Sequence, residues 1–250
     1  MLYLAVPILS AIAFVFSMLG MGGSQLYIPV LFWCGLDFKT QAIPLGMLLN
    51  VVNSSSATVT YARKRLVVWR AALPFGVTMV LFAPLGTIVN ISLPTKPVII
   101  VFAAFTATAA VLMLSGWRPK KGGLSPRATL LLGLAGGAAL GFFAGLIGRG
   151  GGSFVVPLLY IAGLRSKNAA ATSAVAVTFS GSASFVSHLA TAAEPDPLLW
   201  ISAVAVVLLA SQLGSRLMAA KFKSRSVKLV FGCVLLGIAA LLIVKDVLIG

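Results

Sequence analysis

The sequence predicts an all-α integral membrane protein made of two homologous, inverted repeats. Of its 250 residues, 60% are hydrophobic and 9% are charged, which leaves too little polar surface for a soluble protein. Uncharged stretches approach the roughly 20 residues that cross a bilayer core. They cover residues 3–19, 40–62, 71–95, 97–117, 128–148, 168–193, 197–215 and 229–244, of which the first and last run short.

The repeat is visible when the chain is aligned with itself at an offset of 128 residues. Without a gap, this offset pairs Phe14, Gly20, Gly22, Gly23, Pro29, Leu31, Gly35 and Leu36 with Phe142, Gly148, Gly150, Gly151, Pro157, Leu159, Gly163 and Leu164. Such internal symmetry is typical of transporters. We expect membrane repeats at 1–116 and 128–250, joined by a basic cytoplasmic linker at 117–127.

Each copy opens with an apolar run that we expect to form a membrane helix. A glycine break follows, at 20–23 or 148–152, and then an apolar segment of about 13 residues that ends at Gly35 or Gly163. This segment is too short to span a bilayer, so it predicts a re-entrant half-helix or the second half of a broken helix. Three full transmembrane helices are expected after it in each copy.

Basic residues gather in three short loops, which predicts that these loops face the cytoplasm. They are Arg63, Lys64, Arg65 and Arg70, then Arg118, Lys120, Lys121 and Arg127, then Lys221, Lys223, Arg225 and Lys228. Because the equivalent of the first loop carries Glu194 and Asp196 instead, the repeats are expected to be inverted. The alternative is eight simple spans with parallel copies. Twelve of the 19 Lys and Arg residues lie in these loops, so the net charge of +15 predicts no nucleic-acid partner.

The two glycine breaks are the predicted substrate site, because a broken helix presents free N–H groups and a positive dipole end to an anion. The predicted binding residues there are Gly22, Gly23, Ser24, Gln25, Arg149, Gly150, Gly151, Gly152 and Ser153. Arg149 lies far from the basic loops, where a charge is costly and therefore a functional candidate. The alternative for Arg149 is that it reaches the lipid headgroups, which we also expect of Arg216.

The helix after each half-helix carries small polar residues that complete the predicted site. Asn50, Asn53 and Ser54 share one face of the first, as do Thr178 and Ser182 on the second. Asn50, Ser54, Thr178 and Ser182 are expected to bind substrate. The alternative is hydrogen bonding between helices. None of the four acidic residues lies inside a full span, which favours anions over cations, and no metal or cofactor site is predicted.

These residues resemble the sulfite exporter TauE/SafE family over nearly the whole chain. The resemblance rests on the doubled motif of a glycine break followed by proline, with Pro29 and Pro157, and on the duplicated layout. It implies a bacterial inner-membrane permease for small sulfur-containing anions such as sulfite or organosulfonates. The chain departs from full symmetry, because Met21 stands where Arg149 does and Ser24 where Gly152 does.

We therefore expect a multi-pass inner-membrane transporter and no enzyme, working by alternating access. Export is favoured because an inside-negative potential drives anions outward by about 2.3 kcal/mol per charge per 100 mV. The alternatives are a passive anion channel and an intramembrane enzyme. For the latter, the single His188 has no acidic residue in its own span to orient it. The sequence does not specify the oligomeric state.

Overall fold

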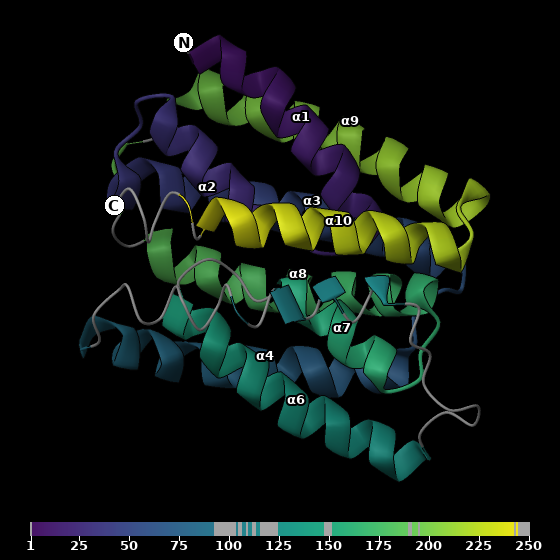
Figure 1. The fold of residues 1–250 in the computed structure, drawn as a ribbon. Helices are drawn as coiled ribbons and strands as arrows, with labels where there is room; N and C mark the ends of the chain where they lie inside the picture. Colours follow the sequence, from purple (N-terminus) through teal and green to yellow (C-terminus); the bar gives the residue numbers. More distant parts are fainter. Residues whose placement is uncertain are drawn as a thin grey trace.

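The computed structural model describes residues 2–92, 104, 107–108, 110–111, 114–115, 125–147, 152–189, 192–194, 196–242 and 244. Within these ranges the chain forms helices and no strand (Figure 1). The helices are α1 (Leu2–Leu19), α2 (Ser24–Trp33), α3 (Ile43–Arg63), α4 (Trp69–Ser92), α6 (Pro126–Ile147), α7 (Gly152–Ile161), α8 (Ser166–Leu189), α9 (Pro197–Lys221) and α10 (Ser224–Leu242). A π-helical turn, η1 (Phe38–Ala42), leads into α3.

Five of the described helical segments are long and apolar enough to cross a membrane. They are Thr40–Arg63, Trp69–Gly86, Arg127–Ala144, Ser166–Leu189 and Pro197–Lys221. A shorter apolar helix covers Ala5–Leu19. The span expected at 97–117 lies mostly outside the described residues. The chain is therefore a helical, multi-pass membrane protein, as its composition predicts.

The helix ends follow from local sequence. The side chain of Asp37 caps η1 by accepting a hydrogen bond from the backbone N–H of Thr40, at 2.8 Å. Asp196 caps α9 in the same way, and Pro197 is the first residue of that helix. α2 and α7 have ten residues each, and both are followed by a glycine with positive φ, 99° at Gly35 and 96° at Gly163.

Elements of the two halves have closely related bounds. Adding 128 to the bounds of α2 gives 152 and 161, which are those of α7. Adding 128 to the bounds of α4 gives 197 and 220, one residue short of the end of α9. In Figure 1, α1, α3 and α9 run from left to right, whereas α4, α6 and α8 run from right to left. Helices that correspond at this offset thus run in opposite directions.

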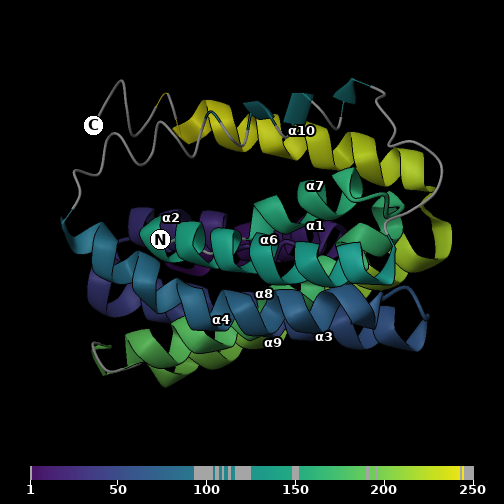
Figure 2. The same ribbon diagram turned by 90° about the horizontal axis from the view of Figure 1, so that it is seen from below.

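The two central helices, α3 and α8, pack against each other and are the most buried of the spans. α1 packs on α9, and α4 packs on α6. The first helix of each half therefore lies against the fourth helix of the other half. α10 lies on one side of this bundle, where it contacts α8 and α1 (Figure 2).

Glycines on one face of α6 bring that helix close to α4. A Cβ on Gly137 would meet Phe75 and Thr78, and one on Gly141 would lie 2.7 Å from the backbone of Met79. Thr78 Oγ1 also donates a hydrogen bond to the carbonyl of Gly133 at 3.2 Å. The stripe of small residues therefore permits direct backbone contact between two helices, as it does in other membrane proteins.

Charged loops occupy different ends of the molecule. The carbonyl of Leu66 accepts a hydrogen bond from Asn168 Nδ2 at 2.9 Å, and Lys167 Nζ donates to the carbonyl of Ala219 at 2.8 Å. The loop after α3 and the end of α9 thus meet at the start of α8. At the other end, the backbone N–H of Ala193 donates to the carbonyl of Thr40, which places the loop with Glu194 beside η1.

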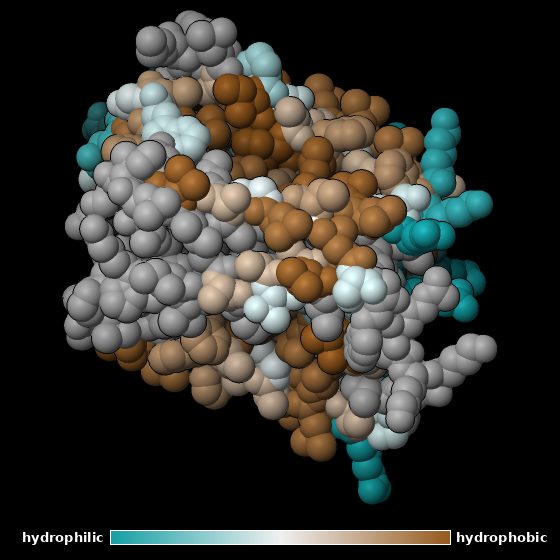
Figure 3. Space-filling model, viewed as in Figure 1, coloured by the Kyte–Doolittle hydropathy of each residue, from teal (hydrophilic) through white to brown (hydrophobic). Residues whose placement is uncertain are grey.

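The surface between these ends is apolar. Large hydrophobic side chains point outward along the spans, including Leu81 (63% exposed), Leu131 (65%) and Ile201 (69%). Figure 3 shows hydrophobic residues across the middle of the visible face and hydrophilic residues at its right edge, where α3 and α9 end in Figure 1. A lipid bilayer is the environment that such a belt requires.

Candidate functional site

The candidate site begins at the glycine break between α1 and α2. Its backbone has positive φ at Gly20 (68°), Gly22 (84°) and Gly23 (120°), a conformation that side chains with a Cβ rarely adopt. A Cβ at Gly20 would also overlap the carbonyl of Ala170 in α8, and one at Gly22 would overlap Asn50 Oδ1 in α3. Glycine is therefore required here both by the turn and by the close approach of the two central helices.

α3 holds this break with two asparagines. Asn50 Oδ1 accepts a hydrogen bond from the backbone N–H of Ser24, the first residue of α2, at 3.2 Å. Asn53 Nδ2 donates to the carbonyl of Gly22. Both asparagines are buried, with 2% and 0% of their surface exposed. One side chain thus binds the start of α2, and the other binds the chain just before it.

Other side chains satisfy carbonyls at the end of α1. Tyr61 of α3 donates its hydroxyl to the carbonyl of Ser17, and Ser173 of α8 donates to the carbonyl of Gly20 at 2.8 Å. The last carbonyls of a helix have no partner within it, and in a membrane they cannot turn to water. Side chains from both central helices therefore fix the break in the first half.

Two buried polar atoms near the break have no hydrogen-bond partner among the described residues. They are the hydroxyl of Tyr27 and Oδ1 of Asn53, and both residues are fully buried. The ring of Tyr27 lies against Gly23, 2.7 Å from the position that a Cβ there would take. Asn53 contacts Gly22. Buried polar atoms are nearly always paired, so these two indicate a place where a polar ligand or water can bind.

The predicted residues of the first half lie together at this break. Ser24 and Gln25 form the first turn of α2 and are buried, as are Asn50 and Ser54 of α3. Ser54 donates its hydroxyl to the carbonyl of Asn50 in its own helix at 2.8 Å. Asn50 and Asn53 make hydrogen bonds between elements, which is what the alternative interpretation of this polar face predicts.

The predicted residues of the second half are only partly described. Arg149, Gly150 and Gly151 lie outside the described residues, whereas Gly152 and Ser153 are in the first turn of α7. Thr178 and Ser182 donate to carbonyls of α8 itself, each at 2.8 Å.

α8 also reaches the first break. A Cβ on Gly181 would lie 2.6 Å from Asn50 Nδ2. Asn50 therefore lies between the break and α8. Thr178 Oγ1 lies 3.4 Å from Thr58 Oγ1 of α3, so hydroxyls of both central helices meet where these helices pack.

Sequence reasoning missed Tyr27, Tyr61 and Ser173. Tyrosine buried in the middle of a membrane protein needs a partner for its hydroxyl, which is a signal that could have identified Tyr27 and Tyr61. Ser173 carries no such signal, because its partner Gly20 lies 153 residues away in the sequence. Among the described residues, no group of three or more His, Cys, Asp or Glu side chains could hold a metal ion.

Comparison with known proteins agrees with this architecture. A curated protein of Xylella fastidiosa strain Temecula1, named "Probable membrane transporter protein", is 28% identical in an alignment 249 residues long. This alignment covers 91% of this chain and 89% of the relative. A protein of the same name from strain 9a5c is 29% identical over 176 residues, 66% of each chain. No solved structure matches the chain significantly.

The family comparison covers almost the whole length. The model of the sulfite exporter TauE/SafE family matches residues 5–242, a range that includes both glycine breaks and all the described helices from α2 to α10. This result confirms the resemblance indicated by the doubled glycine and proline motif. The chain belongs to the sulfite exporter TauE/SafE family of membrane transporters.

Proposed function

We propose that this protein is a bacterial inner-membrane transporter that exports small sulfur-containing anions, such as sulfite or organosulfonates, by alternating access around the two glycine breaks. Membership of the TauE/SafE family supports the class of function. The observation that carries the location of the site is the start of α2, which is buried among the membrane helices and held open by Asn50 and Asn53.

The chemistry of this break suits an anion. The first N–H groups of a helix carry a partial positive charge, and a medium of low dielectric strengthens their attraction for a negative ligand. The hydroxyl of Tyr27 adds a donor with no partner among the described residues. Ser24, Gln25, Gly22 and Gly23 would supply the rest of the first half-site. Arg149, with Gly150, Gly151, Gly152 and Ser153, would supply the second.

The two halves are proposed to be inverted repeats that rock about this site. Three observations support this arrangement: the related bounds of α2 and α7, the opposite directions of corresponding helices, and the packing of α1 on α9 and of α4 on α6. Ser54, Thr178 and Ser182 lie on the two central helices and would line the path. Such inverted repeats around a central site are typical of alternating-access transporters.

A flux experiment in proteoliposomes tests this proposal. Uptake of labelled sulfite, sulfoacetate and taurine is measured under imposed membrane potentials for the wild type and for Arg149→Ala. The matched control is Arg127→Ala, which removes the same charge at an exposed position at the start of α6. We expect saturable, potential-dependent transport of at least one anion, which Arg149→Ala abolishes and Arg127→Ala retains.

The outcomes separate the function from the site. If no sulfur-containing anion is transported by the wild type, the proposed substrate class is wrong. If Arg149→Ala transports as well as the wild type, the substrate class stands and the arginine is not part of the site. Transport that does not saturate at any concentration would instead identify a passive channel.

A further inference from the structure

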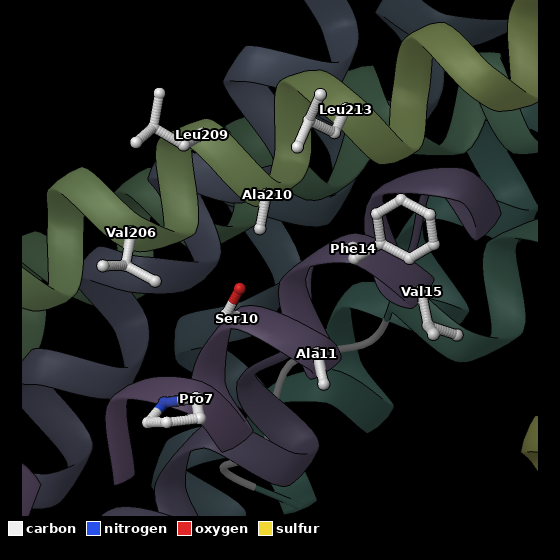
Figure 4. Close-up of a pocket in the computed structure, with 9 residues that line it drawn as sticks. All are labelled: Pro7, Ser10, Ala11, Phe14, Val15, Val206, Leu209, Ala210 and Leu213. Carbon is white, nitrogen blue, oxygen red and sulfur yellow. The ribbon is translucent and has the colours of Figure 1, made fainter. Parts of the chain in front are cut away.

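A groove lies between α1 and α9 on the outer surface of the bundle, beside the place where the two helices pack. It has a volume of about 550 Å³ and is lined by Pro7, Ser10, Ala11, Phe14, Val15, Val206, Leu209, Ala210 and Leu213. Figure 4 shows Ser10 of α1 and Val206 and Ala210 of α9 between the two helices, with the hydroxyl of Ser10 pointing toward Ala210. Eight of the nine side chains are apolar. The groove is therefore suited to a hydrocarbon chain.

The helix pair that forms the groove differs from its counterpart in the position of its glycines. The corresponding pair, α6 and α4, is drawn together by Gly137 and Gly141, which permit backbone contact. At the same positions of α1, after subtracting 128, stand Leu9 and Ala13, and both are buried. α1 contains no glycine, and the close approach between α1 and α9 is at Gly214, where a Cβ would meet Phe14 and Ser17.

A cationic side chain lies beyond one end of the groove. Leu209, Leu213 and Arg216 are spaced by four and three residues, so they share one face of α9. Leu209 and Leu213 are 66% and 65% exposed, and Arg216 is also exposed. Arg216 precedes Lys221, at the basic end of the molecule, by five residues. The face thus changes from apolar to cationic toward the basic end of the molecule, which is the order in which a bilayer presents acyl chains and then headgroups.

We propose that this groove binds one acyl chain of an anionic phospholipid of the cytoplasmic leaflet, with the headgroup phosphate on Arg216. The charge of Arg216 selects the lipid, because its guanidinium attracts an anionic headgroup more strongly than a zwitterionic headgroup. An acyl chain binds more tightly in the groove than elsewhere on the apolar surface, because the groove buries the chain between two helices. No step of the proposed transport cycle is needed for this inference.

Tryptophan fluorescence tests the proposal. Leu209→Trp places a fluorophore at the groove, and Leu81→Trp places one at the corresponding position of α4, which is 63% exposed and has Ile88 where α9 has Arg216. Both variants are reconstituted with phospholipids whose acyl chains are brominated and quench tryptophan. The headgroup is phosphatidylglycerol or phosphatidylcholine, and the signal of the wild-type tryptophans is subtracted.

For Leu209→Trp, we expect half-maximal quenching at an about fivefold lower fraction of the anionic lipid than of the zwitterionic lipid, the ratio that corresponds to about 1 kcal/mol for one arginine near anionic lipid. Leu81→Trp should not distinguish the two lipids. Adding Arg216→Gln to Leu209→Trp should remove the preference. Equal quenching of Leu209→Trp by both lipids, or a preference that survives Arg216→Gln, would overturn the proposal. Efficient disulfide formation between two copies of Leu209→Cys in lipid vesicles would assign the groove to a second copy of the chain and would also overturn it.

Discussion

The two central helices carry similar polar residues and use them differently. In α3, Asn50 and Asn53 bind the glycine break, and Ser56 and Thr60 bind Gln212 of α9. In the second half of α8, the hydroxyls donate to carbonyls of the same helix. These are the bonds from Thr178 to Ala174, from Ser180 to Val177, from Ser182 to Thr178 and from Ser187 to Ala183.

This difference shows that the number of polar residues in a membrane helix does not determine whether they bond to other elements or to their own helix. α3 is tied to its neighbours by directional hydrogen bonds. In the second half of α8, Thr178 meets Thr58 of α3 at 3.4 Å, and Phe179 packs where Gly76 of α4 comes close. Among the described residues, α3 makes more hydrogen bonds to other elements than the second half of α8 does, so we expect α3 to resist displacement more.

The largest loss of stability is expected at the segment that α3 holds. Gly22→Ala should cost about 1–2 kcal/mol for the left-handed backbone and more for displacing Asn50, on which the new Cβ would intrude. The control is Gly35→Ala, which imposes a positive φ of 99° but has nothing within 4 Å of the new Cβ. Thermal unfolding in detergent measures both. Equal losses would mean that Asn50 does not hold the break.

A smaller loss is expected where α3 meets α9. Gln212 Nε2 donates to the carbonyl and to Oγ of Ser56, at 3.1 and 2.6 Å. Gln212→Leu removes these two bonds and the one from Thr60, and should reduce the free energy of unfolding by about 1–2 kcal/mol, because bonds between membrane helices average about 0.6 kcal/mol. Ser202→Ala, which removes a bond within α9 itself, serves as the control and should have little effect. If the two variants unfold at the same temperature, α3 is not anchored through Gln212.

The smallest effect on stability is expected in α8. Thr178→Val keeps the shape of the side chain and removes a bond to its own helix and the longer bond to Thr58, so the free energy of unfolding should change by less than about 1 kcal/mol. Transport should nevertheless fall, because Thr178 is a proposed substrate ligand, and Thr178→Ser should retain it. The flux assay in proteoliposomes separates these effects. Normal flux through Thr178→Val would remove this residue from the site.

Much of this arrangement follows from the sequence alone. The glycine break and the apolar segment up to Gly35 predict a short helix, and the structure has one of ten residues at Ser24–Trp33. Asn50 and Asn53, which the sequence places on one face, both bond to the break. These predictions succeed because a glycine cluster and a helical period are local signals, read within a few turns of chain.

Other features could not be predicted, because they depend on residues far apart in the sequence. The hydroxyl of Ser173 donates to the carbonyl of Gly20, whereas the hydroxyl of Thr178 donates to a carbonyl of its own helix. Nothing in the sequence near Ser173 indicates this difference. The groove is lined by residues of α1 and α9, which lie far apart in the sequence, so no local pattern indicates it. Whether the residues at the second break, including Arg149, face the first one stays a prediction.

The packing of α1 on α9 also has a consequence for biosynthesis. α1 ends at Leu19 and its partner begins at Pro197, so the ribosome must add about 180 residues before the pair can form. At roughly 5–20 residues per second, this takes on the order of 10–35 s. Until α8 has been made, the break at Gly20–Gly23 also lacks the hydrogen bond from Ser173. The insertion machinery, or the lipid itself, must therefore tolerate an unfinished first half until the second half arrives.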